Sequence, residues 1–142
     1  MRDRGHAAVE LALGVGVLLL PAAIVVLSFG PWAERRVDAE AVAAEAARTA
    51  VLQLDQVAGD ATVVSMTDGL AIPADLVRVG WCGSTPGALA ATTGSCSMVR
   101  GEAVSVTVQL WTPLFSTPWG DVGGLWVSGE HAEPIDLYRS LP

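Results

Sequence analysis

Basic residues are scarce in this chain, and lysine is absent altogether. The 8 basic side chains, all arginines, stand against 15 aspartates and glutamates, which gives a formal net charge of −7 at pH 7. The arginines form no cluster, so the electrostatic footprint of a nucleic-acid-binding protein is missing. We therefore expect no nucleic-acid partner and a solvated acidic surface.

Histidine and cysteine are almost as rare, with 2 residues of each. His6 and His131 lie far apart in the sequence and belong to no metal-ligand spacing motif. The serines near the cysteines, such as Ser84 and Ser95, belong to no nucleophile-elbow motif. These absences predict that the chain is not an enzyme and uses neither a metal nor a cofactor.

The two cysteines, Cys82 and Cys96, bound the segment CGSTPGALAATTGSC, whose composition is typical of a loop. Outside the cytoplasm such a pair most naturally forms a disulfide. Closing a loop of about 15 residues stabilises a fold by about 3 kcal/mol on the chain-entropy model. A pair of buried free thiols is the alternative.

Charge is also missing from the run between Leu11 and Ala33. A membrane-spanning helix needs about 20 apolar residues, and this run is long enough. A secretory signal has a shorter apolar core of about 7–15 residues, although Pro31-Trp32-Ala33 resembles the end of one. The run therefore favours a membrane anchor over residues 11–33, with a cleaved signal peptide as the alternative.

The charges that flank the run decide its orientation only weakly. Arg2 and Arg4 precede it, and Arg35 and Arg36 follow it. Because the two sides carry equal numbers of arginines, the positive-inside rule favours neither orientation. The expected disulfide places the downstream part outside the cytoplasm. We therefore expect a single-pass protein of the cytoplasmic membrane with its N-terminus inside, its head outside and Trp32 as an interfacial anchor.

One carboxylate interrupts this pattern, because Glu10 directly precedes the uncharged run. An unpaired charge costs about 2 kcal/mol or more inside a membrane segment. Glu10 therefore needs a partner or a role, unless it lies at the level of the lipid headgroups.

Downstream of the run, helical periodicity continues as far as about Val57. Alanine is the strongest helix former and is abundant here, and the prolines Pro21 and Pro31 predict kinks. The helix of about fifty residues should end before Gly59. Its apolar positions recur at spacings of three and four, which predicts one buried face: Ala33, Val37, Ala41, Ala44, Ala47, Val51 and Leu54.

Alternation then replaces the helical period. It predicts four strands, which start at Ala61, Leu76, Glu102 and Leu125, the clearest being Glu102–Trp111. The Pro- and Gly-rich segment TPLFSTPWGDVGG between the last two is expected to be a loop. The result is an α+β head at residues 59–142, a small antiparallel sheet against a helix. Its tryptophans are expected to pack the head, with an exposed carbohydrate-binding patch as the alternative: Trp81, Trp111, Trp119 and Trp126.

Three segments together resemble a known family. The residues GHAAVE, with an acid fifth after Gly5, resemble a prepilin processing site. The helix RRVDAEAVAAEAARTAVL and the strands EAVSVTVQLWTPLF and GGLWVSGEHAEPIDLYRS resemble TadE/TadG-like minor pilins of the tight-adherence (Flp, type IVc) pilus system, especially those of actinobacteria. The resemblance covers nearly the whole chain.

The resemblance implies a type IV pilin-like fold, with a leader at residues 1–5 and a long helix at residues 6–58. A prepilin peptidase would cut between Gly5 and His6. Glu10 would then pair with the free amine of a neighbouring subunit or of its own chain. The implied partners are that peptidase, other pilin subunits, an inner-membrane assembly platform and membrane lipid. The implied function is a structural subunit of the pilus or of a related secretion machine.

Two other functions are compatible with the same sequence. One is an uncleaved single-pass assembly factor of the same system, which never enters a filament. The other is an anchored adhesin or ligand-binding head, which would need an exposed aromatic patch.

Overall fold

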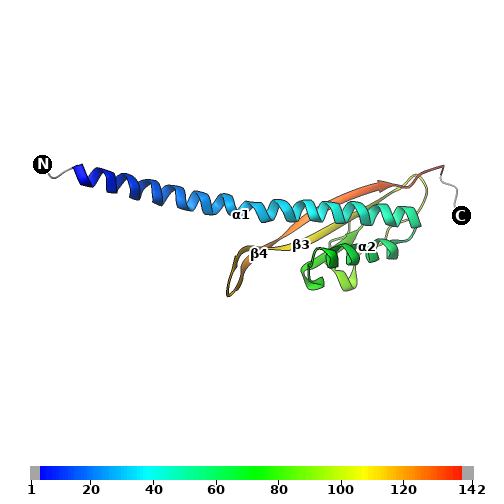
Figure 1. Cartoon of the computed structure of the whole chain (residues 1–142). Helices are drawn as coiled ribbons and strands as arrows, with labels where there is room; N and C mark the ends of the chain where they lie inside the picture. The colour runs from blue at the N-terminus through cyan, green and yellow to red at the C-terminus, as the bar shows by residue number, and fades with distance from the viewer. Residues whose placement is uncertain (1–3, 139–142) are drawn as a thin grey trace.

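The computed structural model describes the backbone of residues 4–138 and the side chains of that range except at residues 4–8, 27–28 and 116–117. Helix α1, Arg4–Gln53, is a 50-residue rod that carries the head on its C-terminal half (Figure 1). Of the leader predicted at residues 1–5, residues 1–3 lie outside the described part. The long apolar helix on a small antiparallel sheet confirms the expected α+β class.

Helix α1 continues through both of its prolines without a break. Proline removes one backbone hydrogen bond in a helix interior, yet Pro21 and Pro31 cause no sharp kink in Figure 1. The helix ends earlier than predicted, at Gln53, because Leu54 takes a left-handed backbone conformation with φ of 53°. Such a conformation cannot continue a right-handed helix.

A second helix, α2, spans Gln56–Gly69 and replaces the strand that was predicted at residues 61–66. Asp55 caps its N-terminus, where the side chain accepts a hydrogen bond of 2.9 Å from the backbone N–H of Val57. The β-branched residues between 62 and 64 favour a strand locally. Tertiary packing overrides that preference, because the buried residues recur every fourth position: Gly59, Val63 and Thr67.

The sheet has four antiparallel strands in the order β2-β1-β3-β4. The strands are β1, Val77–Trp81; β2, Gly87–Ala88; β3, Ala103–Thr117; and β4, Gly120–Pro134. Three of the four predicted strands are therefore confirmed, and the short β2 is the strand that the prediction missed. Two single turns of 3-10 helix, Ala74–Leu76 and Leu89–Ala91, flank β1 and β2.

The segment predicted as a loop is in fact the far end of a hairpin. Strands β3 and β4 pair in one register from Ala103↔Pro134 to Thr117↔Gly120, interrupted at Leu114 and Gly123, and only Pro118 and Trp119 connect them. Proline fixes φ near the value that the first position of a tight turn requires. Strand β1 accompanies β3 only as far as Leu110, so the last part of the hairpin projects beyond the rest of the sheet (Figure 1).

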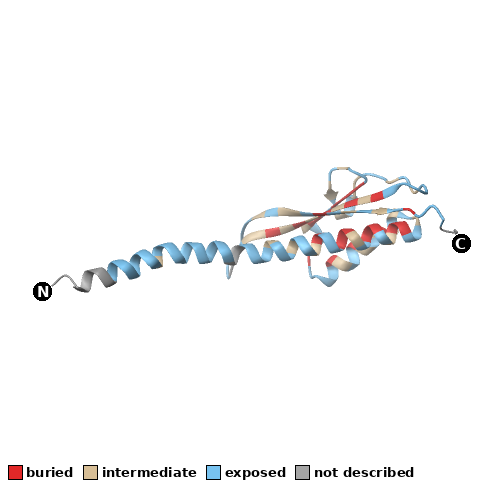
Figure 2. Ribbon diagram, turned by 90° about the horizontal axis from the view of Figure 1, so that it is seen from above, coloured by how far each residue is buried: buried red, intermediate tan, exposed pale blue. Residues whose placement is uncertain are grey.

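Both helices cover the same face of the sheet. Helix α1 packs on β3 and β4 and lies beside α2, and the ring of Trp81 from β1 packs against Gly59 of α2. Buried residues accordingly concentrate in the C-terminal half of α1 and in the facing strands (Figure 2). On β3 the buried residues alternate, as predicted: Val104, Val106, Val108 and Leu110.

The face of α1 that meets the sheet matches the predicted one only in part. Ala47 and Val51 are buried as predicted, whereas Val37 and Ala41 are exposed. The buried side chains form a stripe of small residues because β4 comes very close to the helix, and a Cβ at Gly129 would collide with the backbone of Ala39 and Glu40. The stripe consists of Ala39, Val42, Ala43, Ala46, Ala47, Ala50 and Val51.

Candidate functional site

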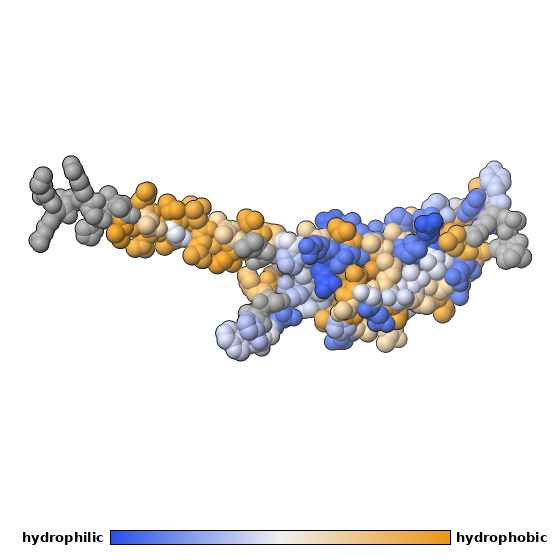
Figure 3. Space-filling view, viewed as in Figure 1, coloured by the Kyte–Doolittle hydropathy of each residue, from blue (hydrophilic) through white to orange (hydrophobic). Residues whose placement is uncertain are grey.

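The N-terminal half of α1 is an apolar rod with no protein packed around most of its length. The region Val9–Gln53 contains a stretch that is long and apolar enough to cross a membrane, by length and composition, and none of that stretch is buried. Large side chains such as Leu18 are exposed there, at 74%. Figure 3 shows the described part of this half as a mostly hydrophobic surface, next to a head whose surface mixes hydrophilic and hydrophobic areas.

Glu10 lies at the start of this apolar rod and is exposed. None of the ion pairs found among the described side chains includes Glu10. Gly5 and His6 belong to the first turns of α1, but their side chains lie outside the described set. The structure therefore places the predicted processing bond near the start of the helix and does not test whether that bond is cut.

At the other end of the rod, charged residues form ion pairs along α1. Arg35 lies 3.7 Å from Asp38, and Arg36 donates a hydrogen bond of 3.0 Å to Glu40. Both pairs are solvent-accessible and contribute little to stability. They mark the point at which the helix surface changes from apolar to polar.

The projecting end of the hairpin, which we call the arm, consists of residues 112–125. It points back toward the N-terminal half of α1, and its end turns away from the helix (Figure 1). The indole N–H of Trp32 donates to the backbone carbonyl of Pro113 over 3.4 Å. The ring of Trp32 also meets Phe29 edge to face, with ring centroids 5.9 Å apart. The hydrogen bond attaches the base of the arm to the helix, and the ring contact lies within α1.

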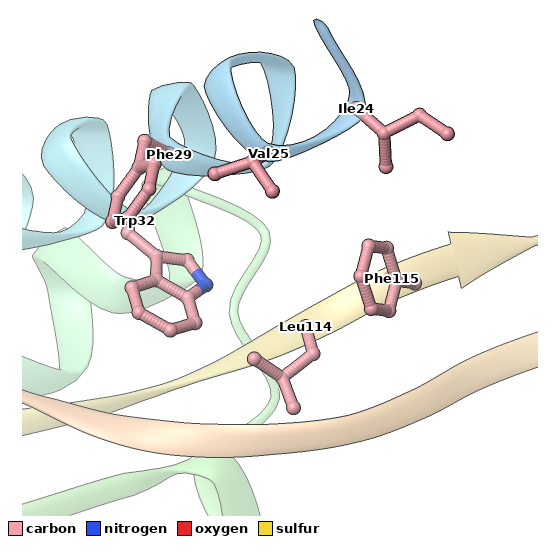
Figure 4. Close-up of a pocket in the computed structure, with 6 residues that line it drawn as sticks. All are labelled: Ile24, Val25, Phe29, Trp32, Leu114 and Phe115. Carbon is pink, nitrogen blue, oxygen red and sulfur yellow. The ribbon is translucent and has the colours of Figure 1, made fainter. Parts of the chain in front are cut away.

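Beyond this attachment, an open apolar cavity of about 180 Å³ separates the arm from α1. Figure 4 shows side chains of α1 on one side of it and of β3 on the other. Its lining contains no charged residue. The lining residues are Ile24, Val25, Phe29, Trp32, Leu114 and Phe115.

The tryptophans of the head differ sharply in environment. Trp81 is fully buried, as predicted, whereas Trp119 at the arm tip is 93% exposed and does not pack the head. Trp111 and Trp126 are half-buried on the sheet face opposite the helices, with ring centroids 5.4 Å apart. The guanidinium of Arg78 lies 4.0 Å from the centre of the Trp126 ring, a cation–π contact.

The predicted disulfide is confirmed, with Cys82 and Cys96 bonded and their Cα atoms 5.4 Å apart. Gln56 ties the same loop to α2. Its side chain donates to the carbonyl of Gly94 and accepts from the N–H of Cys96, both over 3.2 Å. The disulfide loop is thus held to the end of the helical layer as well as to β1.

Titratable groups of the head form no catalytic constellation among the side chains that the structure describes. His131 lies 3.2 Å from Glu133 on partly exposed β4, and no group of three His, Cys, Asp or Glu residues within this set could hold a metal ion. The prediction that the chain is not an enzyme stays a prediction.

Sequence patterns missed the arm because its composition is that of a loop. Pro118, with Gly120 two residues later, was the available signal for a turn at this point. Nothing in the sequence predicted that Trp119 is exposed, because a tryptophan is as compatible with a protein core as with a lipid interface.

No family model, curated protein or solved structure matches this chain.

Proposed function

We propose that the chain is a TadE-like minor pilin or pseudopilin, a membrane-anchored structural subunit of a tight-adherence pilus or related secretion machine. The observation that carries the proposal is the division of α1 into an exposed apolar half and a half packed on the head. A subunit of this kind needs both halves, the first to be stored in a bilayer and the second to hold the head outside it.

The proposed mechanism has three steps and involves no chemistry by the head. The apolar half of α1 holds the chain in the cytoplasmic membrane. Prepilin peptidase then cuts between Gly5 and His6. The freed helix passes into a helical assembly, in which other helices take the place of lipid around its exposed side chains. The close packing of β4 on α1 at Gly129 holds the head on the helix during this transfer.

Glu10 is proposed to guide the transfer. Its carboxylate precedes the apolar half and has no ion-pair partner among the described side chains. A buried carboxylate is tolerated when a cation pairs with it and is costly when none does. The new amine of His6, on the same chain or a neighbouring one, supplies that cation after cleavage.

Mass spectrometry of the membrane-extracted protein tests the processing step. The proposal expects a mature chain that begins at His6, and an N-terminus at Met1 or Arg2 would contradict it. The variant Gly5→Val is the matched control, because it should leave the leader attached. An intact chain in both proteins would favour the uncleaved assembly factor, and a new N-terminus after Ala33 would favour an ordinary secretory signal.

Assembly of Glu10→Ala tests the role of the carboxylate. We expect this variant to accumulate in the membrane and to be depleted from fibres sheared off the cell surface. Glu34→Ala is the control, because Glu34 is also exposed and lies at the opposite end of the apolar half. Equal assembly of the two variants would show that Glu10 is only a charge at headgroup level.

The alternative of an anchored ligand-binding head rests on one observation, the half-buried pair Trp111–Trp126 beneath Arg78. The two rings meet edge to face on the sheet face that the helices leave open, and an aromatic ring on an open face is a suitable surface for a sugar ring. Binding of a glycan library to the detergent-solubilised protein, lost in Trp126→Ala, would support this function.

A further inference from the structure

We infer that the arm is a second membrane contact, with its tip, including Trp119, in the lipid interface on the side of the bilayer where the head lies. This inference rests on the proposed membrane location of α1. It adds a lipid-binding element to the head, distinct from the helix that anchors the chain.

The first argument is the level of the arm along the helix. Phe115 and Leu114 line the same cavity as Ile24 and Val25, so the arm reaches back along α1 well into its apolar half (Figure 4). Ile24 precedes the first charge after the apolar half, Glu34, by ten residues, a rise of about 15 Å. If α1 is in a bilayer, the arm tip therefore cannot lie in bulk water far above it.

The second argument is the chemistry of the tip. Trp119 is 93% exposed, and Val122 and Phe115 on the paired strands are 56% and 50% exposed. Within residues 112–125 the single charged residue is Asp121. Tryptophan is enriched at the headgroup level of membranes, where its ring is half in the apolar phase. The tip has the composition of an interfacial element.

The third argument sets the depth. From Thr112 onward β3 pairs with β4 on one side, and β1 no longer covers its other edge. Unpaired strand edges are not tolerated in the hydrocarbon core, where no water satisfies them. The arm therefore stops at the interface. Figure 3 agrees, because the tip surface is pale and not strongly hydrophobic like the rod beside it.

The length of the rod is compatible with this depth. If the hydrocarbon core ends at the level of the cavity, near Val25, the stretch from Val9 to Val25 provides about 26 Å of helix to cross it. This is slightly less than the typical core thickness of about 30 Å, and local thinning of the bilayer accommodates such a difference. Trp32, hydrogen-bonded to the base of the arm, then lies above the hydrocarbon in the headgroup region, and the ion pairs of Arg35 and Arg36 lie beyond it.

Site-directed fluorophores on the full-length protein in phosphatidylcholine–phosphatidylglycerol vesicles test the inference. Single cysteines are introduced under non-reducing conditions at Leu18 in the rod, at Trp119 in the arm and at Val57 in α2. Each cysteine is labelled with an environment-sensitive dye. The fluorescence of the dye is then quenched by lipids that carry a nitroxide either near the headgroup (shallow) or near the end of the acyl chain (deep). Leu18 and Val57 are suitable sites because both are highly exposed, at 74% and 71%.

We expect the Trp119→Cys dye to be quenched more strongly by the shallow nitroxide than by the deep one. The Leu18→Cys dye should be quenched most by the deep nitroxide, and the Val57→Cys dye by neither. Loss of quenching at residue 119 alone would overturn the inference and leave the proposed anchor intact. Loss at residue 18 would overturn the membrane location itself.

A series of decreasing protein-to-lipid ratios shows whether the arm tip contacts lipid or a second copy of the chain. Quenching by lipid that persists at the lowest protein-to-lipid ratio supports the inference. A dye at residue 119 that is shielded only at high protein density would assign the arm tip to a neighbouring subunit, against the inference.

Discussion

The two halves of α1 both present apolar side chains and use them in opposite ways. Between Val9 and Leu20 the large side chains, such as Leu18 and Val17, are exposed. Between Ala39 and Val51 the side chains in contact with the sheet are almost all alanine and fully buried. Side-chain size thus separates the surfaces more than hydrophobicity does.

This difference has a physical reason. A sheet can approach a helix closely only where the helix presents small side chains, and here β4 comes so close that Gly129 has no room for a Cβ. A lipid surface imposes no such fit, because acyl chains adapt to bulky residues. One continuous helix can therefore carry a fitted surface, which is closely packed against the sheet, and an unfitted surface, which is not. Substitutions in the two halves should change the stability of the head unequally.

The largest effect is expected from removal of the disulfide, which stabilises only the head. The double variant Cys82→Ser/Cys96→Ser should lower the free energy of unfolding of the head by about 3 kcal/mol, as expected for a loop of this length. Urea denaturation in detergent micelles, followed by near-ultraviolet circular dichroism, measures this. Ser97→Ala, an exposed neighbour, is the control. A loss below about 1 kcal/mol would contradict the prediction.

The next largest effect compares the same substitution in the two halves. Ala46→Leu places extra methyl groups in a fully buried position and should cost about 2 kcal/mol of head stability. Ala12→Leu, at an exposed position of the rod, should change it by less than about 0.5 kcal/mol. If Ala46→Leu and Ala12→Leu lowered the stability of the head equally in the same denaturation experiment, the proposed difference between the two halves of α1 would be wrong.

A smaller effect is expected from the polar contact that orients the largest buried ring. The indole N–H of Trp81 donates to Asp60 over 2.9 Å, and the second carboxylate oxygen of Asp60 accepts from Thr92. Asp60→Ala leaves the indole N–H unpaired and should cost about 1.5 kcal/mol. Asp60→Asn keeps an acceptor and should cost less. The prediction fails if the asparagine variant is the less stable of the two.

The smallest effect concerns the boundary between the halves. Trp32→Phe removes a long hydrogen bond to Pro113 but retains a ring in the cavity, so head stability should fall by less than about 1 kcal/mol. Hydrogen exchange of the arm should nevertheless become faster, while exchange in the rest of β3 and β4 stays constant. Unchanged exchange in the arm would show that Trp32 does not hold it.

Much of the fold was predictable because its signals are periodic. The long helix, the core of β3 with its alternating valines, and the pairing of Cys82 with Cys96 all follow from local pattern or residue count. The apolar run likewise indicated the exposed half of α1. In each case the information lies within one segment of the chain.

The parts that were missed depend on contacts between segments. Residues 61–66 form helix because Gly59 and Val63 pack against the core, a contact that outweighs the strand preference of Thr62 and its neighbours. The buried face of α1 was predicted correctly at Ala47 and Val51 but wrongly at Val37 and Ala41, because it depends on where β4 lies. Residues 112–125 pair as a hairpin although their prolines and glycines are typical of loops. Glu10 and the bond between Gly5 and His6 are still open to test.

The length of α1 beyond the anchor determines how far the head reaches from it. With the bilayer surface near Gly30 in the proposed membrane location, residues 31–53 of the helix extend about 35 Å beyond that surface. The end of the head farthest from the anchor then contains the junction between α1 and α2 at Leu54 and Asp55, together with the end of β4 (Figure 1). In the proposed orientation, a partner that approaches from outside the cell would meet this end of the head before it could reach the arm.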